Sequence, residues 1–344
     1  MPWDEGLVNS LVYDAPDPSE GRVLSYVKAI NEALTIALTH DPAVFVMGQG
    51  VDDPSAMFGT TRGLQSEFGV TRVFDTPLSE EAMMGVSTGA AMNGMRPVFM
   101  HNRPDFVLLA FNQLVTHAAK IHFMDNGQTN VPMVVWAAIG RGWGSGAQHS
   151  QAIQGLLLGV PGLKIVMPST PYDAKGLLLS AILDNNPVCV FEHRWLMKKD
   201  GIVPDGFYRV PLGKGTYRRR GSDVTIVGAS HAIELGLQAA VQLEAEGISA
   251  EVIDLRTIKP MDEHIILESL EKTGRIVVVD TAWMKGGVCA EVGCLAAEKG
   301  FHYLRAPVAR VGLPDIPTPA GYTLEQYFYP DAARIAAAAR SLLR

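Results

Sequence analysis

The sequence has few cysteines, and none is spaced for metal binding. Its 344 residues include only Cys189, Cys289 and Cys294, each within an apolar or small-residue segment. A sparse, odd number of thiols suits a reducing compartment and argues against a disulfide framework. We therefore expect these cysteines to be buried thiols that take no part in chemistry.

Excess positive charge and long apolar runs are also missing. The formal net charge is −7, which argues against a general nucleic-acid surface because such surfaces need clustered lysine and arginine. No run reaches the roughly 18 apolar residues of a transmembrane helix, and the N-terminus lacks the apolar core of a signal peptide. We expect a cytoplasmic protein that contacts neither nucleic acid nor membrane.

Short apolar strands alternate with helical patterns along most of the chain. Hydrophobic residues make up 47% of the sequence and charged residues 19%, which predicts a well-buried core. Buried apolar strands joined by helices are typical of mostly parallel sheets with helices on both faces, the α/β class. The expected strands are 43–47, 96–100, 131–138, 163–167, 188–191, 224–228, 250–254 and 275–280. The expected helices are 25–39, 80–93, 106–123, 172–183, 233–246, 263–272 and 288–299.

The pattern divides into two such α/β domains. The segment from Lys198 to Thr216 is rich in Gly, Pro and Lys and lacks sustained periodicity, as expected of an interdomain connection. We predict a first domain at 1–195, a linker at 196–218 and a second domain at 219–344.

The first candidate site follows a probable strand at Val73 and Phe74. There the sequence Asp75-Thr76-Pro77-Leu78-Ser79-Glu80-Glu81 opens a helix rich in Gly, Ala and Met. Ser79 is a suitable N-cap and a carboxylate suits the first turn, so one glutamate has a purely structural explanation. The glycines do not, because each costs a helix roughly 1 kcal/mol relative to alanine. Close approach by another backbone or a ligand would explain them.

The second candidate is the glycine-rich loop from Gly142 to Gln151, which contains His149 and follows the predicted strand 131–138. A glycine-rich loop after a strand is where open α/β sheets place ligands. Alone the loop is a weak signal, because a loop histidine is often only a surface or hydrogen-bonding residue.

Together with their neighbours, these segments resemble the β subunits of pyruvate, branched-chain 2-oxo acid and acetoin dehydrogenases, which depend on thiamine diphosphate. The resemblance runs from about Leu24 to the C-terminus. It implies a transketolase-type pyrimidine-binding domain followed by a transketolase-type C-terminal domain. The segments that carry it include 76–80, 89–94, Arg96-Pro97, 118–120, Gln148-His149-Ser150-Gln151, 161–164, 184–187 and 251–257.

The resemblance also implies roles for individual residues. Glu80 matches the carboxylate that hydrogen-bonds the cofactor's aminopyrimidine, although the adjacent Glu81 remains an alternative. The Leu78 carbonyl matches the acceptor of the amino hydrogen, and Phe106 matches an aromatic ring that packs on the pyrimidine, with a core aromatic as the alternative. His149 matches an active-site histidine that supplies a proton or a hydrogen bond during acyl transfer.

Asp184 and Asn186 match a loop that carries a monovalent-cation site, such as one for potassium, in some relatives. A turn stabilised by these two side chains is the alternative.

Two segments depart from the family pattern. Many relatives carry an acid where this chain has Gln49, and many carry one after the Arg-Pro strand, where this chain has Met100-His101-Asn102-Arg103-Pro104. His101, Asn102 and Arg103 are therefore candidate substrate contacts, and continued strand geometry would place His101 and Arg103 on one face. We hypothesise that Arg103 selects a substrate with an extra anionic or polar group, with a structural ion pair as the alternative.

Half of a cofactor site is missing from the sequence. There is no Gly-Asp-Gly, which usually begins the diphosphate–magnesium motif, and no P-loop or Gly-x-Gly-x-x-Gly. In the family that site, with its magnesium, belongs to the α subunit, and the cofactor lies between α and β in an α₂β₂ heterotetramer. We therefore predict that this chain alone binds thiamine diphosphate poorly, and we expect a lipoyl acyltransferase core as a further partner.

The leading prediction is oxidative decarboxylation of a 2-oxo acid with acyl transfer to a lipoyl group. One alternative is non-oxidative transfer of a two-carbon acyl unit to an aldehyde or ketone, to which the altered segment 100–104 gives weight. The other is a non-catalytic regulatory chain, against which the presence of Glu80 and His149 argues.

Overall fold

The structure is a computed structural model that describes residues 17, 19–55, 57–140 and 144–344. The chain forms two compact units. The first comprises Met1–Ala138 and Val160–Leu212, and the second comprises Ile139–Gly159 and Gly213–Arg344. The segment 139–159, which we predicted within the first domain, thus groups with the C-terminal half.

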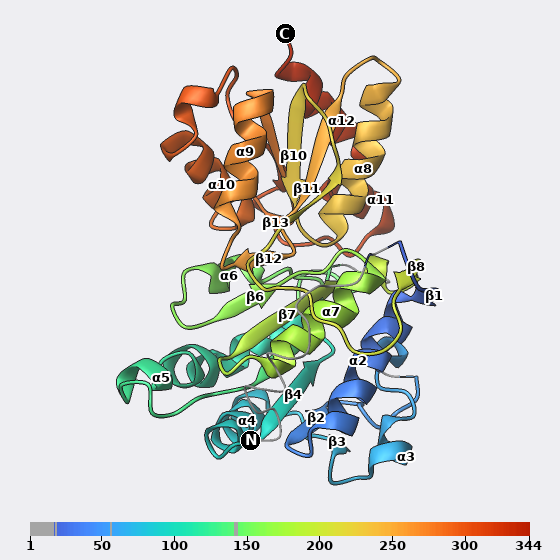
Figure 1. Ribbon diagram of the computed structural model, residues 1–344, viewed down its shortest axis with the longest axis vertical. Helices are drawn as coiled ribbons and strands as arrows, with labels where there is room; N and C mark the ends of the chain where they lie inside the picture. The colour runs from blue at the N-terminus through green and yellow to red at the C-terminus, as the bar shows by residue number, and fades with distance from the viewer. Residues whose placement is uncertain (1–16, 18, 56, 141–143) are drawn as a thin grey trace. The chain divides into compact units, whose positions relative to one another are not determined.

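A parallel sheet forms the centre of the first unit (Figure 1). The described pairings of its strands are all parallel, and each strand is short and almost wholly buried except β3. In spatial order the strands are β6 (Lys164–Val166), β7 (Val188–His193), β5 (Val134–Ile139), β4 (Arg96–His101), β2 (Val44–Gly48) and β3 (Val73–Asp75). The mostly parallel α/β class predicted for this half is confirmed.

Helices α2 (Tyr26–His40) and α7 (Pro171–Leu183) pack together on one face of this sheet. Helix α2 begins where the Ser25 side chain accepts a hydrogen bond from the Lys28 amide, and it ends at Asp41, before Pro42. Helix α7 is buried along its whole length, and its Lys175 donates to Glu32 of α2 at 2.6 Å and to the Pro204 carbonyl. A buried ammonium is tolerated here because two acceptors satisfy it.

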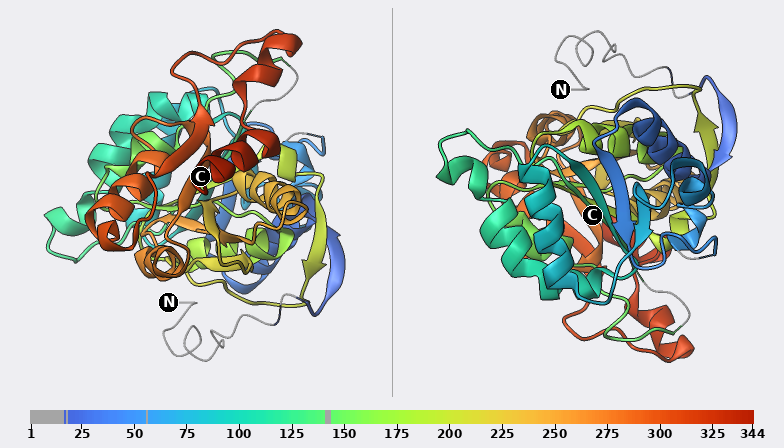
Figure 2. Two further views of the ribbon diagram at one scale, coloured as in Figure 1. Left: turned by 90° about the horizontal axis from the view of Figure 1, so that it is seen from above. Right: turned by 90° about the horizontal axis from the view of Figure 1, so that it is seen from below.

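The other face is covered by α4 (Glu80–Met92) and by a helical path that runs from Pro104 to Met124 (Figure 2). We expected one helix at 106–123, and that expectation is wrong in type. The path consists of a 3₁₀ segment η2 (Pro104–Ala110), a π segment η3 (Asn112–Ala118) and a short helix α5 (Ile121–Met124). Val107, Ala110, Leu114 and Ala118 lie at helical spacing along this path and are all buried.

Smaller elements complete the first unit. Strand β1 (Arg22–Ser25) pairs antiparallel with β8 (Asp200–Val203), so part of the predicted linker is a strand. The remaining elements are η1 (Met57–Gly59), α3 (Leu64–Phe68) and η4 (Arg194–Leu196).

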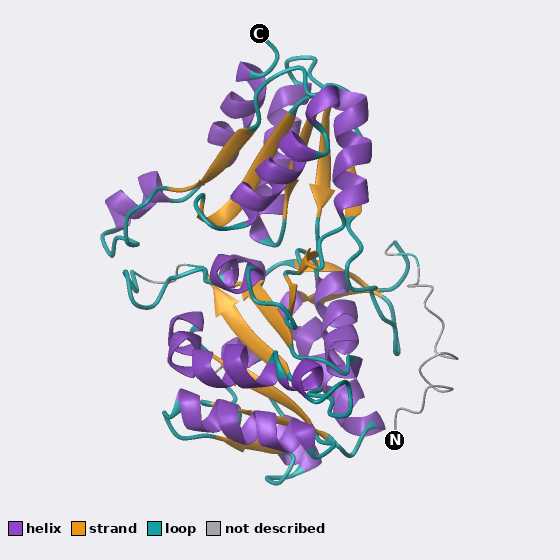
Figure 3. Cartoon of the chain, turned by 90° about the vertical axis from the view of Figure 1, so that its left-hand side faces the viewer, coloured by secondary structure: helices purple, strands orange, loops and turns teal. Residues whose placement is uncertain are grey.

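The second unit is a five-stranded sheet between two pairs of helices (Figure 3). Its spatial order is β14 (Ala309–Leu313), β13 (Ile276–Trp283), β10 (Val224–Gly228), β11 (Ala250–Asp254) and β9 (Thr216–Arg219), and only β9 is antiparallel to its neighbour. Helices α8 (His231–Glu244) and α12 (Ala332–Ser341) share one core, and α9 (Glu263–Thr273) and α10 (Val288–Glu298) cover the other face. Also present are α6 (Gln154–Leu158), β12 (Thr257–Lys259), η5 (Phe301–Tyr303) and α11 (Tyr322–Phe328).

Two of the three cysteines are buried as expected, and one is not. Cys189 lies in β7 and Cys289 in α10, whereas Cys294 is exposed on α10. Cys294 lies on the outer side of α10, between Gly293 and the buried Leu295. Among the described residues, no helix is long and apolar enough to cross a membrane.

Candidate functional site

The carboxyl ends of β2, β3 and β4 gather polar side chains at one edge of the first sheet. Strand β2 ends at Gly48, which has a φ of +151°. A Cβ at Gly48 would lie 2.1 Å from the Met100 carbonyl oxygen of β4, so only glycine lets the two strands approach at this point. The residues that follow, Gln49 after β2 and Asn102 after β4, are thereby brought together, at the edge where parallel sheets place ligands.

Glu80 lies at the first position of α4 and points inward. Glu80 is only 8% exposed, whereas Glu81 is exposed. This difference favours Glu80 over Glu81 as the functional acid. Ser79 occupies the N-cap position, but its side chain makes no capping hydrogen bond. The capping hydrogen bond from Ser79 that we expected on structural grounds is therefore not observed. What distinguishes this helix start is the buried side chain of Glu80.

A chain of hydrogen bonds connects the two strand ends to Glu80. The Gln49 side-chain amide donates to Glu80 Oε1 at 3.1 Å. Asn102 donates through Nδ2 to the Gln49 carbonyl at 3.0 Å. Beside them, the Gly50 amide donates to the Asp75 carboxylate at the end of β3. Glu80 is thus held by a neutral amide, at the position where many members of the resembled family carry an acid.

His101, Asn102 and Arg103 differ in environment. His101 ends β4 and is buried, with its ring against Phe99 at 4.1 Å between centroids. Burial lowers the pKa of the His101 imidazole to about 3, so this residue is neutral. Burial also lowers the pKa of the half-buried Arg103 guanidinium, an effect that Asp105 opposes. Strand β4 ends at His101, so the alternation of side chains along a strand does not extend to Arg103. The strand therefore gives no support to our prediction that His101 and Arg103 share a face.

An open hollow of about 630 Å³ lies beside Glu80. The Leu78 side chain near it is 78% exposed, and Phe106 in η2 is partly exposed, so neither side chain belongs to the deep core. Both alternatives for Phe106 stay predictions. The hollow is lined by Ser79, Glu80, Glu81, Ala82, Gly85, Leu109 and Gln113.

The glycines of α4 leave space on its outer side. A Cβ at Gly89 would meet no atom within 4 Å, and one at Gly85 would meet Gln113 at 3.6 Å. Close packing within the described part of this chain therefore does not require Gly89. Val86 and Met92 of the same helix are exposed apolar residues.

His149 lies in the second unit, in a turn that precedes α6. Its backbone amide donates to the Gly146 carbonyl at 3.4 Å, and Gly146 has a φ of +68°. Gly142 and Trp143 of the predicted loop fall outside the described residues. His149 is partly exposed.

Asp184 and Asn186 bind one another in a turn. Asp184 Oδ1 accepts from the Asn186 amide at 2.9 Å and from Asn186 Nδ2 at 3.1 Å, and Asp184 Oδ2 pairs with Lys164. This arrangement matches the alternative of a turn stabilised by the two side chains. A potassium site at these residues stays a prediction.

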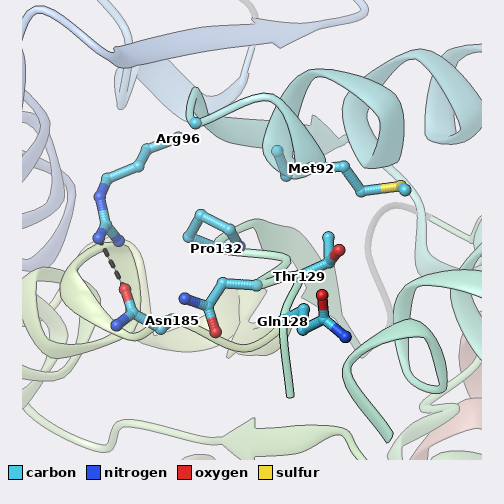
Figure 4. Close-up of a pocket in the computed structure, with 9 residues that line it drawn as sticks. Met92, Arg96, Gln128, Thr129, Pro132 and Asn185 are labelled. Carbon is cyan, nitrogen blue, oxygen red and sulfur yellow. Dashed lines mark hydrogen bonds between the residues drawn. The ribbon is translucent and has the colours of Figure 1, made fainter. Parts of the chain in front are cut away.

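A separate cavity of about 170 Å³ lies beside this turn, at the amino ends of β4 and β5 (Figure 4). Arg96 reaches Asn185 Oδ1 at 2.8 Å at its margin, and it also donates to the carbonyls of Ile182 and Asp184. The Arg96 guanidinium thus stabilises the turn at residues 182–185 through these hydrogen bonds. Within the described ranges, no group of three or more His, Cys, Asp or Glu side chains is placed to hold a metal ion.

Sequence reasoning missed three polar residues, of which Glu192 and Asp280 are buried and Gln49 is partly buried. Gln49 was noted as a departure but not as a partner of Glu80. Glu192, at the end of β7, is completely buried, and burial raises the pKa of its carboxyl well above the usual range while the indole of Trp136 opposes the shift. Asp280, in β13, accepts from Gln154 at 3.1 Å. Gln49 and Glu192 lie at or near a strand's carboxyl end, and that position was the available signal, whereas Asp280 lies in the middle of β13.

The fold and this site define a chain of the transketolase type. Residues 22–199 match the family described as "Transketolase, pyrimidine binding domain", and residues 213–335 match "Transketolase, C-terminal domain". Among solved structures, the chain is similar to "Split gene transketolase, inactive beta4 tetramer" with a TM-score of 0.74 and 24% identity, covering 94% of this chain and 99% of that one. At that identity the likeness shows the fold alone.

Sequence comparison with named proteins shows which transketolase-type family the chain belongs to. The chain is 41% identical to the "Acetoin:2,6-dichlorophenolindophenol oxidoreductase subunit beta" of Bacillus subtilis (strain 168), over 94% of this chain and 98% of that one. It is 42% identical to the "2-oxoisovalerate dehydrogenase subunit beta" of the same organism, over 93% and 98%. It is 39% identical to the "Pyruvate dehydrogenase E1 component subunit beta" of Acholeplasma laidlawii, over 94% and 98%. The chain belongs to the family of 2-oxo acid dehydrogenase E1 β subunits, and the predicted resemblance is confirmed.

Proposed function

We propose that this chain is the β subunit of a thiamine-diphosphate-dependent 2-oxo acid dehydrogenase and provides the pyrimidine-binding half of its active site. The observation that carries the proposal is the buried Glu80 carboxylate, which is fixed by Gln49 beside an open hollow. A carboxylate held in this way is suited to accept one specific hydrogen bond rather than to meet solvent.

The residues fit the pyrimidine half of the cofactor. Gln49 donates a hydrogen bond to Oε1 of Glu80. Within the described residues Oε2 of Glu80 accepts no hydrogen bond, so this oxygen remains for the cofactor. The Leu78 carbonyl would accept the amino hydrogen and Phe106 would pack on the ring. Thiamine diphosphate, when bound, supplies the electron sink for loss of carbon dioxide. Glu80 then holds or releases a proton at the ring nitrogen.

Two further roles belong to the same proposal. His149 would donate a proton or a hydrogen bond while the acyl group passes to a lipoyl acceptor. Arg103 would select the 2-oxo acid, since it is a half-buried cation whose Nε makes no hydrogen bond in the described part of the chain. The names of the relatives, which are dehydrogenases and oxidoreductases, favour oxidative chemistry over the carboligase alternative.

The other half of the site would come from an α subunit. The diphosphate and magnesium need ligands that the sequence of this chain does not offer as a motif. The outer side of α4, with free space at Gly89 and exposed Val86 and Met92, is where we place the α chain in an α₂β₂ heterotetramer. A lipoyl acyltransferase core would receive the product.

One experiment tests the proposal. Thiamine diphosphate with magnesium is titrated calorimetrically into this chain, into the α chain and into the reconstituted pair, and 2-oxo acid decarboxylation by the pair is assayed. We expect tight binding only by the pair, and loss of decarboxylation by at least about a hundredfold in Glu80→Gln, in line with the loss of one preorganised catalytic group.

The matched control is Glu81→Gln, which makes the same change one residue away on an exposed side chain. It should retain activity. Tight binding by this chain alone, or equal activity of the Glu80→Gln and Glu81→Gln pairs, would refute the proposal.

A further inference from the structure

The segment that carries His149 is attached at both ends to the second unit. On its N-terminal side, a Cβ at Gly144 would lie 3.0 Å from the Ala320 carbonyl oxygen, and one at Gly146 would lie 3.3 Å from the Ala320 Cβ. On its C-terminal side the chain enters the short helix α6, which packs against β13. His149 therefore lies between two anchored points, five residues before Gln154.

The C-terminal anchor is a buried side-chain hydrogen bond. Gln154 Nε2 donates to Asp280 Oδ1 at 3.1 Å, and the two residues are 0% and 3% exposed. This bond leaves Gln154 Oε1 and Asp280 Oδ2 buried without a hydrogen-bond partner among the described residues. Losing it would leave two more buried polar atoms unpaired, and an unpaired buried polar group costs more than a typical hydrogen bond contributes. The bond therefore fixes where α6 begins.

Backbone packing reinforces the same anchor. A Cβ at Gly155 would lie 2.9 Å from the Gly286 carbonyl oxygen and 3.1 Å from the Gly287 Cα, so α6 touches the loop after β13 directly. At the other end of α6, the Lys259 ammonium donates to the Leu158 carbonyl. Of these contacts, only the one between Gln154 and Asp280 joins two side chains, so it can be removed from either side by substitution.

We propose that Gln154 and Asp280 are positioning residues for the transfer step, because their hydrogen bond fixes the His149 segment on β13. The inference rests on the proposed function for the role of His149, but the position of the segment can be measured separately. Neither residue needs to touch substrate or cofactor. Their effect passes through the backbone from Gln154 to His149.

The protonation of Asp280 does not break this bond. Burial raises the pKa of Asp280 to about 7, and the hydrogen bond from Gln154 opposes that shift. Either form of the carboxyl offers Oδ1 as an acceptor. Two other groups face this region. Burial, and after it the Asp280 carboxylate, raises the pKa of the Cys289 thiol on α10, and Arg310 on β14 opposes that rise. Neither takes the place of Gln154 as the donor.

The test uses the reconstituted α–β pair and three readouts. These are decarboxylation with an artificial electron acceptor, acyl transfer to lipoamide, and amide hydrogen exchange over residues 144–153. We expect Gln154→Leu and Asp280→Leu each to lower the acyl-transfer kcat about tenfold, the effect of one lost hydrogen bond. Decarboxylation should change less, and exchange in the segment should rise.

Compensating substitutions at Gln154 and Asp280 distinguish a loss of positioning from a general loss of folding. Asp280→Asn keeps an acceptor and should behave as the wild type. Gln154→Glu faces Asp280 with a second acid, so its transfer rate should fall as pH rises and both carboxyls ionise. Adding Asp280→Asn to Gln154→Glu restores a donor and an acceptor in reversed order and should recover the rate. Failure of that recovery, or unchanged exchange in Gln154→Leu, would overturn the proposal.

Two controls complete the design. Gln238→Leu removes an exposed bond of the same kind, from Gln238 Nε2 to Glu234 Oε1 at 3.2 Å, and should change none of the readouts. His149→Gln reports on the proposed function instead. If it retains full acyl transfer, His149 is not needed, while exchange and rescue still decide whether Gln154 and Asp280 hold the segment.

Discussion

Replacing Gln49 with leucine tests whether a neutral amide is what makes Glu80 effective. The substitution keeps a side chain of similar size and removes the donor that lies 3.1 Å from Glu80 Oε1. The Gln49 carbonyl still accepts from Asn102, so the backbone after β2 should stay in place. The change is therefore confined to the orientation and solvation of one carboxylate.

The magnitude follows from the burial of the pair. A hydrogen bond to a charged group contributes roughly 1.5–3 kcal/mol, or roughly ten- to hundredfold in rate. Since Glu80 is buried but Gln49 is only partly so, we expect the lower end, about a tenfold loss in kcat for decarboxylation. Cofactor affinity should weaken less, because the phosphate contacts lie on the other subunit under the proposed function.

The assay compares this variant with a matched control. Gln65 is also partly buried, and its amide donates to the Val73 carbonyl at 3.0 Å. Gln65→Leu therefore removes a similar hydrogen bond from the same unit without touching Glu80. Both variants should lose similar thermal stability, and only Gln49→Leu should lose activity in the reconstituted pair. Equal activity of the two would refute the reasoning about Glu80.

Two further predictions concern specificity and pH. Arg103→Met should change the relative rates across a panel of 2-oxo acids, most of all for those with an anionic or polar side chain, and unchanged relative rates would contradict the assignment. The pKa of Asp280 is raised from 3.8 to about 7, so the folded state binds a proton that the unfolded state has lost at intermediate pH. The stability contributed by this group is complete below pH 3.8 and is lost as pH rises towards 7, by up to about 4 kcal/mol. The melting temperature of wild type relative to Asp280→Asn should therefore fall between pH 5 and pH 7, and parallel curves would contradict the assigned cause.

Local patterns were sufficient for most of the fold. The strand at 224–228 and the strand at 250–254 are observed at the predicted bounds, because short runs with β-branched residues between turn residues are typical of strands. The segment 106–123 shows where that reasoning stops. Its apolar spacing predicted a helix, but over so short a segment the same spacing is compatible with 3₁₀, α and π hydrogen bonding.

The grouping of residues 139–159 could not be read from local patterns. One of the contacts that tie this segment to the second unit joins Gln154 and Asp280, which are 126 positions apart. A glutamine in a loop and an aspartate in a strand have ordinary surface explanations when each is read alone. Only their mutual burial shows that they satisfy one another.

The site around Glu80 illustrates how far a positional rule can go. In a parallel sheet, polar residues just beyond the carboxyl ends of strands are candidates for chemistry, and Gln49, Asn102 and Glu192 all satisfy that rule. The rule does not say which of them meet. Register decides that, since Gly48 lies opposite Met100 and has no side chain to hold the strands apart. Gln49 therefore reaches both Asn102 and Glu80, and a larger residue at Gly48 should separate the three even though none of them is changed.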